Sequence, residues 1–251
     1  MAVITELLDD LRAESRVLDD LVAPLPDWAV PTPAEGWTIA NQISHLRWTD
    51  RLAALAARDP GAFTEALRGA RPDMVDEGAR EPVTLAQWRA SRAELAEALT
   101  ALPPGVKVPW FGPPMSAVSM ATARLMETWA HGQDVADALG VTREPTHRLK
   151  HVAHLAVRTF GWSFAVNGLE APQVPVRVEL VGPDGERWAW GPEDAEDRVS
   201  GPALDFCLLA TQRRHRDDLA VTAVGPAATA WLPLAQAFAG PPGPGRGQGR
   251  P

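Results

Sequence analysis

The chain of 251 residues is long enough for one large domain or two modest ones, and 45% hydrophobic and 22% charged residues are an ordinary globular balance. Its formal net charge of −8 argues against general nucleic-acid binding, which requires a basic surface. No apolar run reaches transmembrane length, and the N-terminus is acidic and amphipathic rather than a signal peptide, so we expect a cytoplasmic protein. Because Cys207 is the single cysteine, the chain has no internal disulfide, and any metal must be held by histidine and carboxylate.

The first half of the chain has the apolar periodicity of amphipathic helices joined by proline-rich connections. The expected helices span residues 3–23, about 38–57, from Thr84 through Leu99, and from Ser116 or Ser119 to Gly140. Threonine or serine at a helix start is a favoured N-cap, and glycine is a frequent C-terminal stop. Residues 58–82 read as irregular except for a short helix near 63–67, and residues 103–115 read as turns. Four such helices predict an up-and-down bundle.

The second half mixes helical and strand patterns. We expect helices over residues 146–166, 201–215 and 227–238, and strands over 174–181, 187–190 and 219–224. The Pro-Asp-Gly turn at 183–185 favours a hairpin between the first two strands. The expected organisation is a four-helix bundle over residues 1–141, a smaller α+β domain over 142–239, and a disordered, low-complexity tail over 240–251.

Three residues of the bundle are candidate metal ligands. Glu127 and His131 are four residues apart, so they lie on the same face of their helix and can share one divalent metal or simply one hydrogen bond. His45 borders the apolar stripe of the second helix. It is either a histidine at the edge of the core that bonds a backbone carbonyl, or a third ligand from a facing helix. Two histidines and one carboxylate, with a position left open, form a catalytic type of metal site.

Each of the other polar candidates has two possible interpretations. Asp134 and Asp50 either orient a ligand imidazole or are surface acids. The histidines at 147, 151 and 154 form either a metal-binding helix face or a solvated or inter-domain face, and the lack of an acidic partner favours the second. Cys207 stands among apolar residues, which favours an inert core thiol over a nucleophile.

Two segments carry a family resemblance: GWTIANQISHL around His45, and METWAHGQDVADALG around Glu127 and His131. The first half resembles the DinB-like metal-binding bundle, in the branch typified by mycothiol-dependent maleylpyruvate isomerase. The resemblance implies a divalent metal, usually zinc, held by these three residues. It also implies that mycothiol is the thiol. The second half resembles the C-terminal α+β domain of that family, which is similar to sterol-carrier-like folds. The resemblance therefore covers nearly the whole ordered chain.

The resemblance further implies a catalytic arginine late in a helix that follows a Gly-Pro of the second domain. Here Gly201-Pro202 precedes Arg213 and Arg214, and either could match, although the segment LLATQRRHRDD departs from the family's Gly-Arg ending. A guanidinium fork suits a substrate carboxylate. Alternatively, these arginines are C-terminal helix cations that interact with the helix dipole and with nearby aspartates.

We therefore expect a metal-dependent enzyme in which a low-molecular-weight thiol binds the metal as a thiolate and attacks a small electrophilic, carboxylated substrate. The outcome is either a thiol adduct, formed by an S-transferase, or a cis–trans isomer. One alternative is a hydrolase that uses metal-bound hydroxide. Another is a non-catalytic protein that binds metal or an apolar ligand. The partners expected are the thiol and the small-molecule substrate, with no nucleic acid and no membrane.

Overall fold

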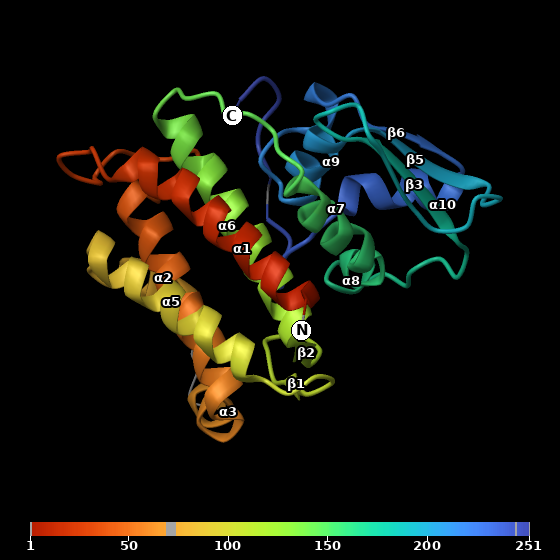
Figure 1. Cartoon of the computed structure of the whole chain (residues 1–251). Helices are drawn as coiled ribbons and strands as arrows, with labels where there is room; N and C mark the ends of the chain where they lie inside the picture. Colours follow the sequence, from red (N-terminus) through yellow and green to blue (C-terminus); the bar gives the residue numbers. More distant parts are fainter. Residues whose placement is uncertain (1, 69–73, 244, 251) are drawn as a thin grey trace. The chain divides into compact units, whose positions relative to one another are not determined.

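The computed structural model describes residues 2–68, 74–243 and 245–250 (Figure 1). Two compact units make up the chain, Met1–Thr142 and Arg143–Pro251. The first unit is helical and the second combines helices with a sheet, so the expected fold class is confirmed. No helix in the described residues is long and apolar enough to cross a membrane. The cytoplasmic location stays a prediction, as does disorder of the tail.

Four long helices form the first unit, and all four match the sequence expectation. They are α1 Ala2–Val22, α2 Ile39–Arg58, α5 Leu85–Ala101 and α6 Ala117–Ala138. The N-caps are Thr38, Thr84 and Ser116, and the Ser116 hydroxyl accepts a hydrogen bond from the N–H of Ser119. Beyond α6 the chain passes through Gly140 with a φ of 67°, a left-handed conformation that glycine adopts without steric cost.

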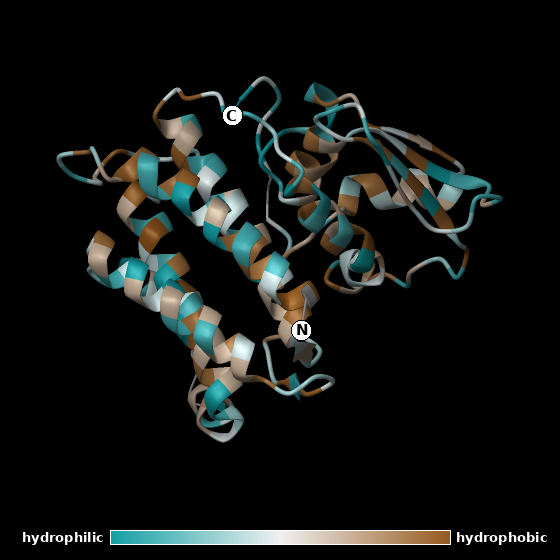
Figure 2. Cartoon of the chain, in the orientation of Figure 1, coloured by the Kyte–Doolittle hydropathy of each residue, from teal (hydrophilic) through white to brown (hydrophobic). Residues whose placement is uncertain are grey.

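The core of the first unit joins these four helices. α1 packs on α6, and α2 packs on both α5 and α6. One buried cluster takes side chains from all four: Leu18, Val22, Ile39, Ile43, Leu46, Trp88 and Val135. Hydrophobic and hydrophilic residues alternate along these helices, as an amphipathic bundle requires (Figure 2). Burial of the apolar stripe therefore aligns α2 with α6, the two helices that carry the candidate ligands.

The segment expected to be irregular contains two helices. α3 spans Pro60–Arg68 and includes the short helix expected at 63–67, whereas α4, Met74–Arg80, was not expected. The proline content was misleading because Pro60 stands at the first position of α3, where its missing N–H has no cost, and the Asp59 carboxylate caps the N–H of Ala62 at 2.9 Å. In the turn-rich connection, β1 Lys107–Val108 pairs with β2 Met115–Ser116.

The second unit contains a four-stranded sheet in the order β4-β3-β5-β6. Its strands are β3 Val176–Val181, β4 Arg187–Trp190, β5 Asp197–Pro202 and β6 Thr222–Val224. β3 and β4 form the expected hairpin, and β6 lies within the expected 219–224 segment. β5 was not expected. It runs parallel to β3 and antiparallel to β6, so it completes the sheet between them.

Each helix expected in the second unit is shorter than predicted. Residues 146–166 form two helices, α7 Leu149–Arg158 and α8 Phe160–Ala165, interrupted at Thr159, whose hydroxyl contacts the Gln236 carbonyl at 2.7 Å. The last expected helix is reduced to α10 Pro226–Trp231 and a 3-10 turn, Leu232–Leu234, where Pro233 lacks the N–H that an α-helix needs. A further 3-10 turn spans Arg216–Asp218.

The expected helix over residues 201–215 is α9, Ala203–Ala210, and it stops before both candidate arginines. Gln212 has a φ of 59°, and the N–H groups of Gln212 and Arg213 bond back to the carbonyls of Leu209 and Leu208 at 2.9 and 2.8 Å. This is a Schellman termination. Arg213 and Arg214 therefore lie in the turn that follows α9, and the prediction that they are neighbours within a helix was wrong.

Candidate metal centre

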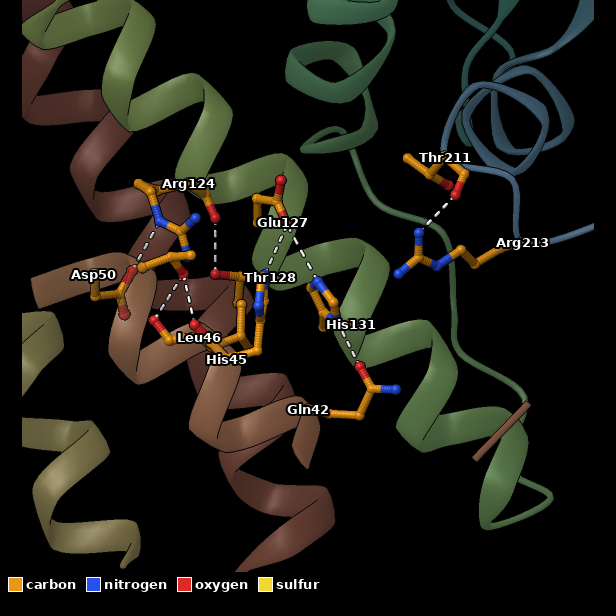
Figure 3. Close-up of polar contacts among 11 residues, drawn as sticks. Gln42, His45, Leu46, Asp50, Arg124, Glu127, Thr128, His131, Thr211 and Arg213 are labelled. Atoms are coloured by element: carbon orange, nitrogen blue, oxygen red, sulfur yellow. Dashed lines mark hydrogen bonds and ion pairs between the residues drawn. The ribbon is translucent and has the colours of Figure 1, made fainter. Parts of the chain in front are cut away.

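His45, on α2, and Glu127 and His131, on α6, bring their ligand atoms together (Figure 3). The Glu127 Oε2 lies 3.2 Å from His131 Nε2 and 3.7 Å from His45 Nε2. One donor atom from each residue lies within 4.8 Å of the other two, and these residues form the single group of three or more such ligands in the described residues. The two positions on α6 converge because they are one helical turn apart, and α2 supplies the third through packing of its apolar stripe.

The spacing of these atoms suits a small divalent ion. Zinc bonds of about 2.0–2.2 Å at tetrahedral angles place neighbouring ligand atoms roughly 3.3–3.6 Å apart. The two measured separations, 3.2 and 3.7 Å, lie close to this range. Two imidazoles and one carboxylate are also a donor set that zinc accepts with a coordination position left open. The residues present therefore fit the metal that the family resemblance implies.

Glu127 is held in its anionic form. Burial would raise the pKa of the Glu127 carboxyl, but hydrogen bonds with His131 and His45, together with the nearby charges of His131 and Arg124, hold that pKa well below its usual range. Its side chain is 20% exposed, whereas those of His45 and His131 are 11% exposed. An anionic carboxylate with partial access to solvent is a competent metal ligand near neutral pH.

Aromatic rings border the two histidines. Trp37 stacks against His131 with ring centroids 6.0 Å apart and an interplanar angle of 16°, and it lies 5.5 Å from His45. Trp48 lies 6.2 Å from His45 and 6.3 Å from Phe111, which is 39% exposed. These rings restrict the orientation of both imidazoles and give the candidate site an apolar border.

A buried ion pair lies one helical turn from the ligands. Arg124 Nε donates to Asp50 Oδ1 at 2.9 Å, and the two side chains are 2% and 4% exposed (Figure 3). Asp50 is therefore not a surface acid. Its carboxylate accepts a hydrogen bond from Arg124 rather than from a ligand imidazole. Asp134 is fully buried, so the interpretation that it is a surface acid was also wrong. Sequence reasoning missed the role of Arg124, because only packing of α2 on α6 brings it to Asp50.

The other candidates lie in the second unit. His154 Nδ1 accepts a hydrogen bond from Trp190 Nε1 at 3.2 Å, and the histidines at 147, 151 and 154 form no metal-ligand group among the described residues. Cys207 is fully buried, and burial raises the pKa of its thiol, which favours the inert reading.

The two candidate arginines donate to backbone carbonyls in the turn after α9. Arg213 Nη1 donates to the Thr211 carbonyl and Arg214 Nη1 to the Arg213 carbonyl, each at 2.6 Å. Their role toward a substrate stays a prediction.

Sequence reasoning did not single out Gln42, although it lies three residues before His45 and thus near the same face of α2. It is fully buried, and its side-chain oxygen forms a short hydrogen bond with His131 Nδ1 (Figure 3). The spacing of Gln42 and His45 was the available signal, but the partner on α6 could be recognised only from the structure.

Comparison with known proteins identifies two family similarities. Residues 11–136 match the model of the mycothiol maleylpyruvate isomerase N-terminal domain, and residues 172–224 match a model described as wyosine base formation. Two uncharacterized proteins of Mycobacterium tuberculosis, from strains CDC 1551 / Oshkosh and ATCC 25618 / H37Rv, are each 57% identical over 248 residues. These alignments cover 94% of this chain and 96% of each relative.

Two crystal structures of mycothiol-dependent maleylpyruvate isomerase share the fold, one of them of a histidine-to-alanine mutant. Each superposes with a TM-score of 0.60, at 19% identity for the mutant and 18% for the other, over 88% of this chain and 92% of the solved chain. At this level of identity the likeness concerns the fold alone. It extends through most of the helical unit and the α+β unit.

Proposed function

Because this chain belongs to the mycothiol maleylpyruvate isomerase N-terminal domain family, we propose that it is a metal-dependent enzyme that uses a low-molecular-weight thiol, with mycothiol as the thiol. Its reaction is the transfer of that thiol to a small electrophilic substrate, or the cis–trans isomerisation of such a substrate. The observation that carries the proposal is the convergence of two imidazole nitrogens and one carboxylate oxygen from α2 and α6.

All three residues are metal ligands in this proposal. His45 and His131 each offer Nε2, and Glu127 offers Oε2. With two neutral imidazoles and one carboxylate, a bound divalent ion such as zinc retains one net positive charge, which favours a thiol in its deprotonated form. The depressed pKa of Glu127 keeps the carboxylate available over the neutral range.

The substrate requires an orienting group as well as a nucleophile. We assign this role to Arg213 or Arg214, because a guanidinium donates two parallel hydrogen bonds to one carboxylate whereas lysine does not. Arg213 and Arg214 each donate to a backbone carbonyl through Nη1, which holds both guanidinium groups near the turn after α9. Arg→Lys changes at the two positions, made separately, should lower turnover for the clamping residue with no loss of metal.

Metal content of the purified full-length protein tests the ligand set. The wild type should bind about one equivalent of zinc, and His45→Ala, His131→Ala and Glu127→Ala should each lose most of it, because two remaining ligands hold zinc weakly. His154→Ala is the matched control, since His154 lies outside the group, and it should retain the metal. Full metal retention in a His45→Ala, His131→Ala double variant would exclude these residues as ligands.

Cobalt substitution separates thiol chemistry from hydrolysis. A thiol that coordinates the cobalt-loaded protein produces a sulfur-to-cobalt charge-transfer band, and turnover by the zinc protein should require added mycothiol. Turnover without any thiol, together with the absence of that band, would favour the hydrolase. Ligand binding that survives loss of all three metal ligands, with no turnover, would favour a non-catalytic carrier.

A further inference from the structure

Gln42 links the candidate metal centre to the loop that precedes α2. Its side chain is fully buried, and each end of its amide has one polar partner. One end lies 2.9 Å from the Thr32 hydroxyl, and the other contacts His131 Nδ1. The Thr32 hydroxyl in turn lies 3.0 Å from the backbone carbonyl of Trp37. These contacts form one chain from a backbone carbonyl to a candidate metal ligand.

The direction of this chain follows from its first member. A carbonyl only accepts, so the single hydroxyl hydrogen of Thr32 is donated to Trp37. The hydroxyl therefore accepts from Gln42, and the Gln42 atom that faces it is the amide nitrogen. The other atom of the amide is the carbonyl oxygen, which accepts from His131, so His131 carries its hydrogen on Nδ1. In a neutral imidazole the lone pair is then on Nε2, the atom that faces Glu127. The contact of Nε2 with the Glu127 carboxylate is a hydrogen bond only when the ring carries a second hydrogen and is an imidazolium.

From this chain of contacts we infer that Gln42 is a positioning residue that holds His131 in the Nδ1–H tautomer and thereby presents Nε2 to a metal. The inference rests on the proposed metal function for its purpose, but the tautomer itself is a property of the metal-free protein. The opposite orientation of the amide would place a hydrogen on Nε2, where it would point at Glu127 and occupy the metal-binding lone pair. A hydrogen-bond partner on the second ring nitrogen is a common way to orient a ligand histidine.

The loop that precedes α2, whose Thr32 orients the Gln42 amide, has a fixed conformation. Pro31 and Thr38 form an isolated antiparallel bridge, and the Thr32 N–H donates to the Trp37 carbonyl at 2.8 Å. The Trp37 side chain from the same loop stacks on the His131 ring. The loop therefore constrains His131 twice, through the amide of Gln42 at the ring edge and through the indole on the ring face.

His45 is not constrained in this way. Its Nδ1 is buried and has no hydrogen-bond partner among the described residues. A change at Gln42 should consequently alter the tautomer of His131 and leave that of His45 as it is. This difference provides a comparison within one molecule.

The test is a measurement of histidine tautomers in metal-free, 15N-labelled protein, by long-range 1H–15N correlation spectra at a pH where the imidazoles are neutral. Wild-type His131 should be in the Nδ1–H form. Gln42→Leu should lose this preference, because the competing acceptor, Glu127, faces Nε2. Gln42→Glu supplies a carboxylate acceptor and should preserve the Nδ1–H form. Thr32→Val removes the group that orients the amide and should give a mixture of tautomers.

Zinc affinity, measured by competition with a chromophoric chelator, is the second readout. Gln42→Leu should weaken binding about 10–100-fold, and Gln42→Glu should restore it to the wild-type level or above. The matched control is Gln133→Leu. Gln133 is a buried glutamine of α6 that donates to Asp137 at 2.9 Å, and its loss should change neither zinc affinity nor the His131 tautomer.

The outcomes separate the inference from the proposed function. An Nε2–H tautomer in the wild type, or an unchanged tautomer in folded Gln42→Leu, overturns the inference. If Gln42→Leu does not fold, an Nε2–H form in Gln42→Glu overturns it instead. If the wild type has the Nδ1–H form and loses it in Gln42→Leu but binds no zinc, the positioning role stands and the metal function is wrong.

Discussion

The buried pair Arg124 and Asp50 should respond very differently to loss of one partner and to loss of both. The side chains are 2% and 4% exposed, so either charge stays largely removed from water when its partner is lost. Removing one member of such a pair costs about 3–5 kcal/mol, because an uncompensated charge stays buried. Replacing both by apolar residues is often neutral or stabilising, because the desolvation of two charges is also removed.

The two single variants should not be equally destabilised. In Asp50→Leu the guanidinium cannot lose its proton, so we expect a loss at the upper end of that range. In Arg124→Met the carboxyl can become neutral. Burial already raises the pKa of Asp50, against the lowering effect of Arg124, and without Arg124 that pKa should rise further. We therefore expect a loss near 3 kcal/mol at pH 7.

The pH dependence of Arg124→Met has a definite sign. An acid whose folded-state pKa lies above its unfolded value binds more protons when folded, so its contribution to stability is full at low pH and is lost as pH rises through the folded pKa. Relative to the wild type, the Arg124→Met variant should regain stability as pH falls through the raised folded pKa of Asp50 toward the unfolded value of about 3.8. Asp50→Leu should show no such recovery.

Amide hydrogen exchange in α6 is the appropriate assay, because it reports unfolding of the first unit separately from the second. Measurements with a chelator present exclude stabilisation by bound metal. The Asp50→Leu, Arg124→Met double variant should lose less than either single variant. A double variant as unstable as the sum of the singles would refute the reasoning, as would a loss below about 1 kcal/mol in Asp50→Leu.

Two further predictions concern the same unit. In Gly78→Ala the new Cβ would lie 2.5 Å from Cδ2 of Trp48, so the indole that borders His45 must move. The near-UV circular dichroism of the folded variant should therefore differ from that of the wild type. An unaltered spectrum would show that the indole does not need to move. Asp19 is bound by two arginines, with the hydrogen bond from Arg89 the largest factor, and these lower the pKa of its carboxyl. The stability that this contact contributes is present above the unfolded pKa of about 3.8 and is lost as pH falls through the lower folded pKa. Asp19→Asn should therefore lower the free energy of unfolding by about 1–2 kcal/mol at pH 7, and by progressively less as the pH falls below about 3.8. A loss of stability that does not depend on pH would contradict the assignment.

Local sequence was sufficient for the long helices of the first unit. α1, α2, α5 and α6 were predicted because each has a continuous apolar stripe. The starts of α2, α5 and α6 were located because threonine and serine caps act within one turn. The pairing of Glu127 with His131 was equally local, since four residues are one helical turn. Inclusion of His45 required a facing helix, which the family resemblance suggested and the packing of α2 on α6 provides.

The features that sequence reasoning missed depend on contacts between distant residues. β5 has no clear alternation, and it becomes a strand because β3 and β6 supply hydrogen bonds on its two sides. α9 ends before Arg213 because the backbone turns at Gln212, although the residues that follow have adequate helix propensity. The contact of Gln42 with His131 joins residues 89 positions apart. Helix patterns and caps are set by neighbours along the chain, whereas the partners of buried polar groups are set by which helices pack together, and only the tertiary structure decides that.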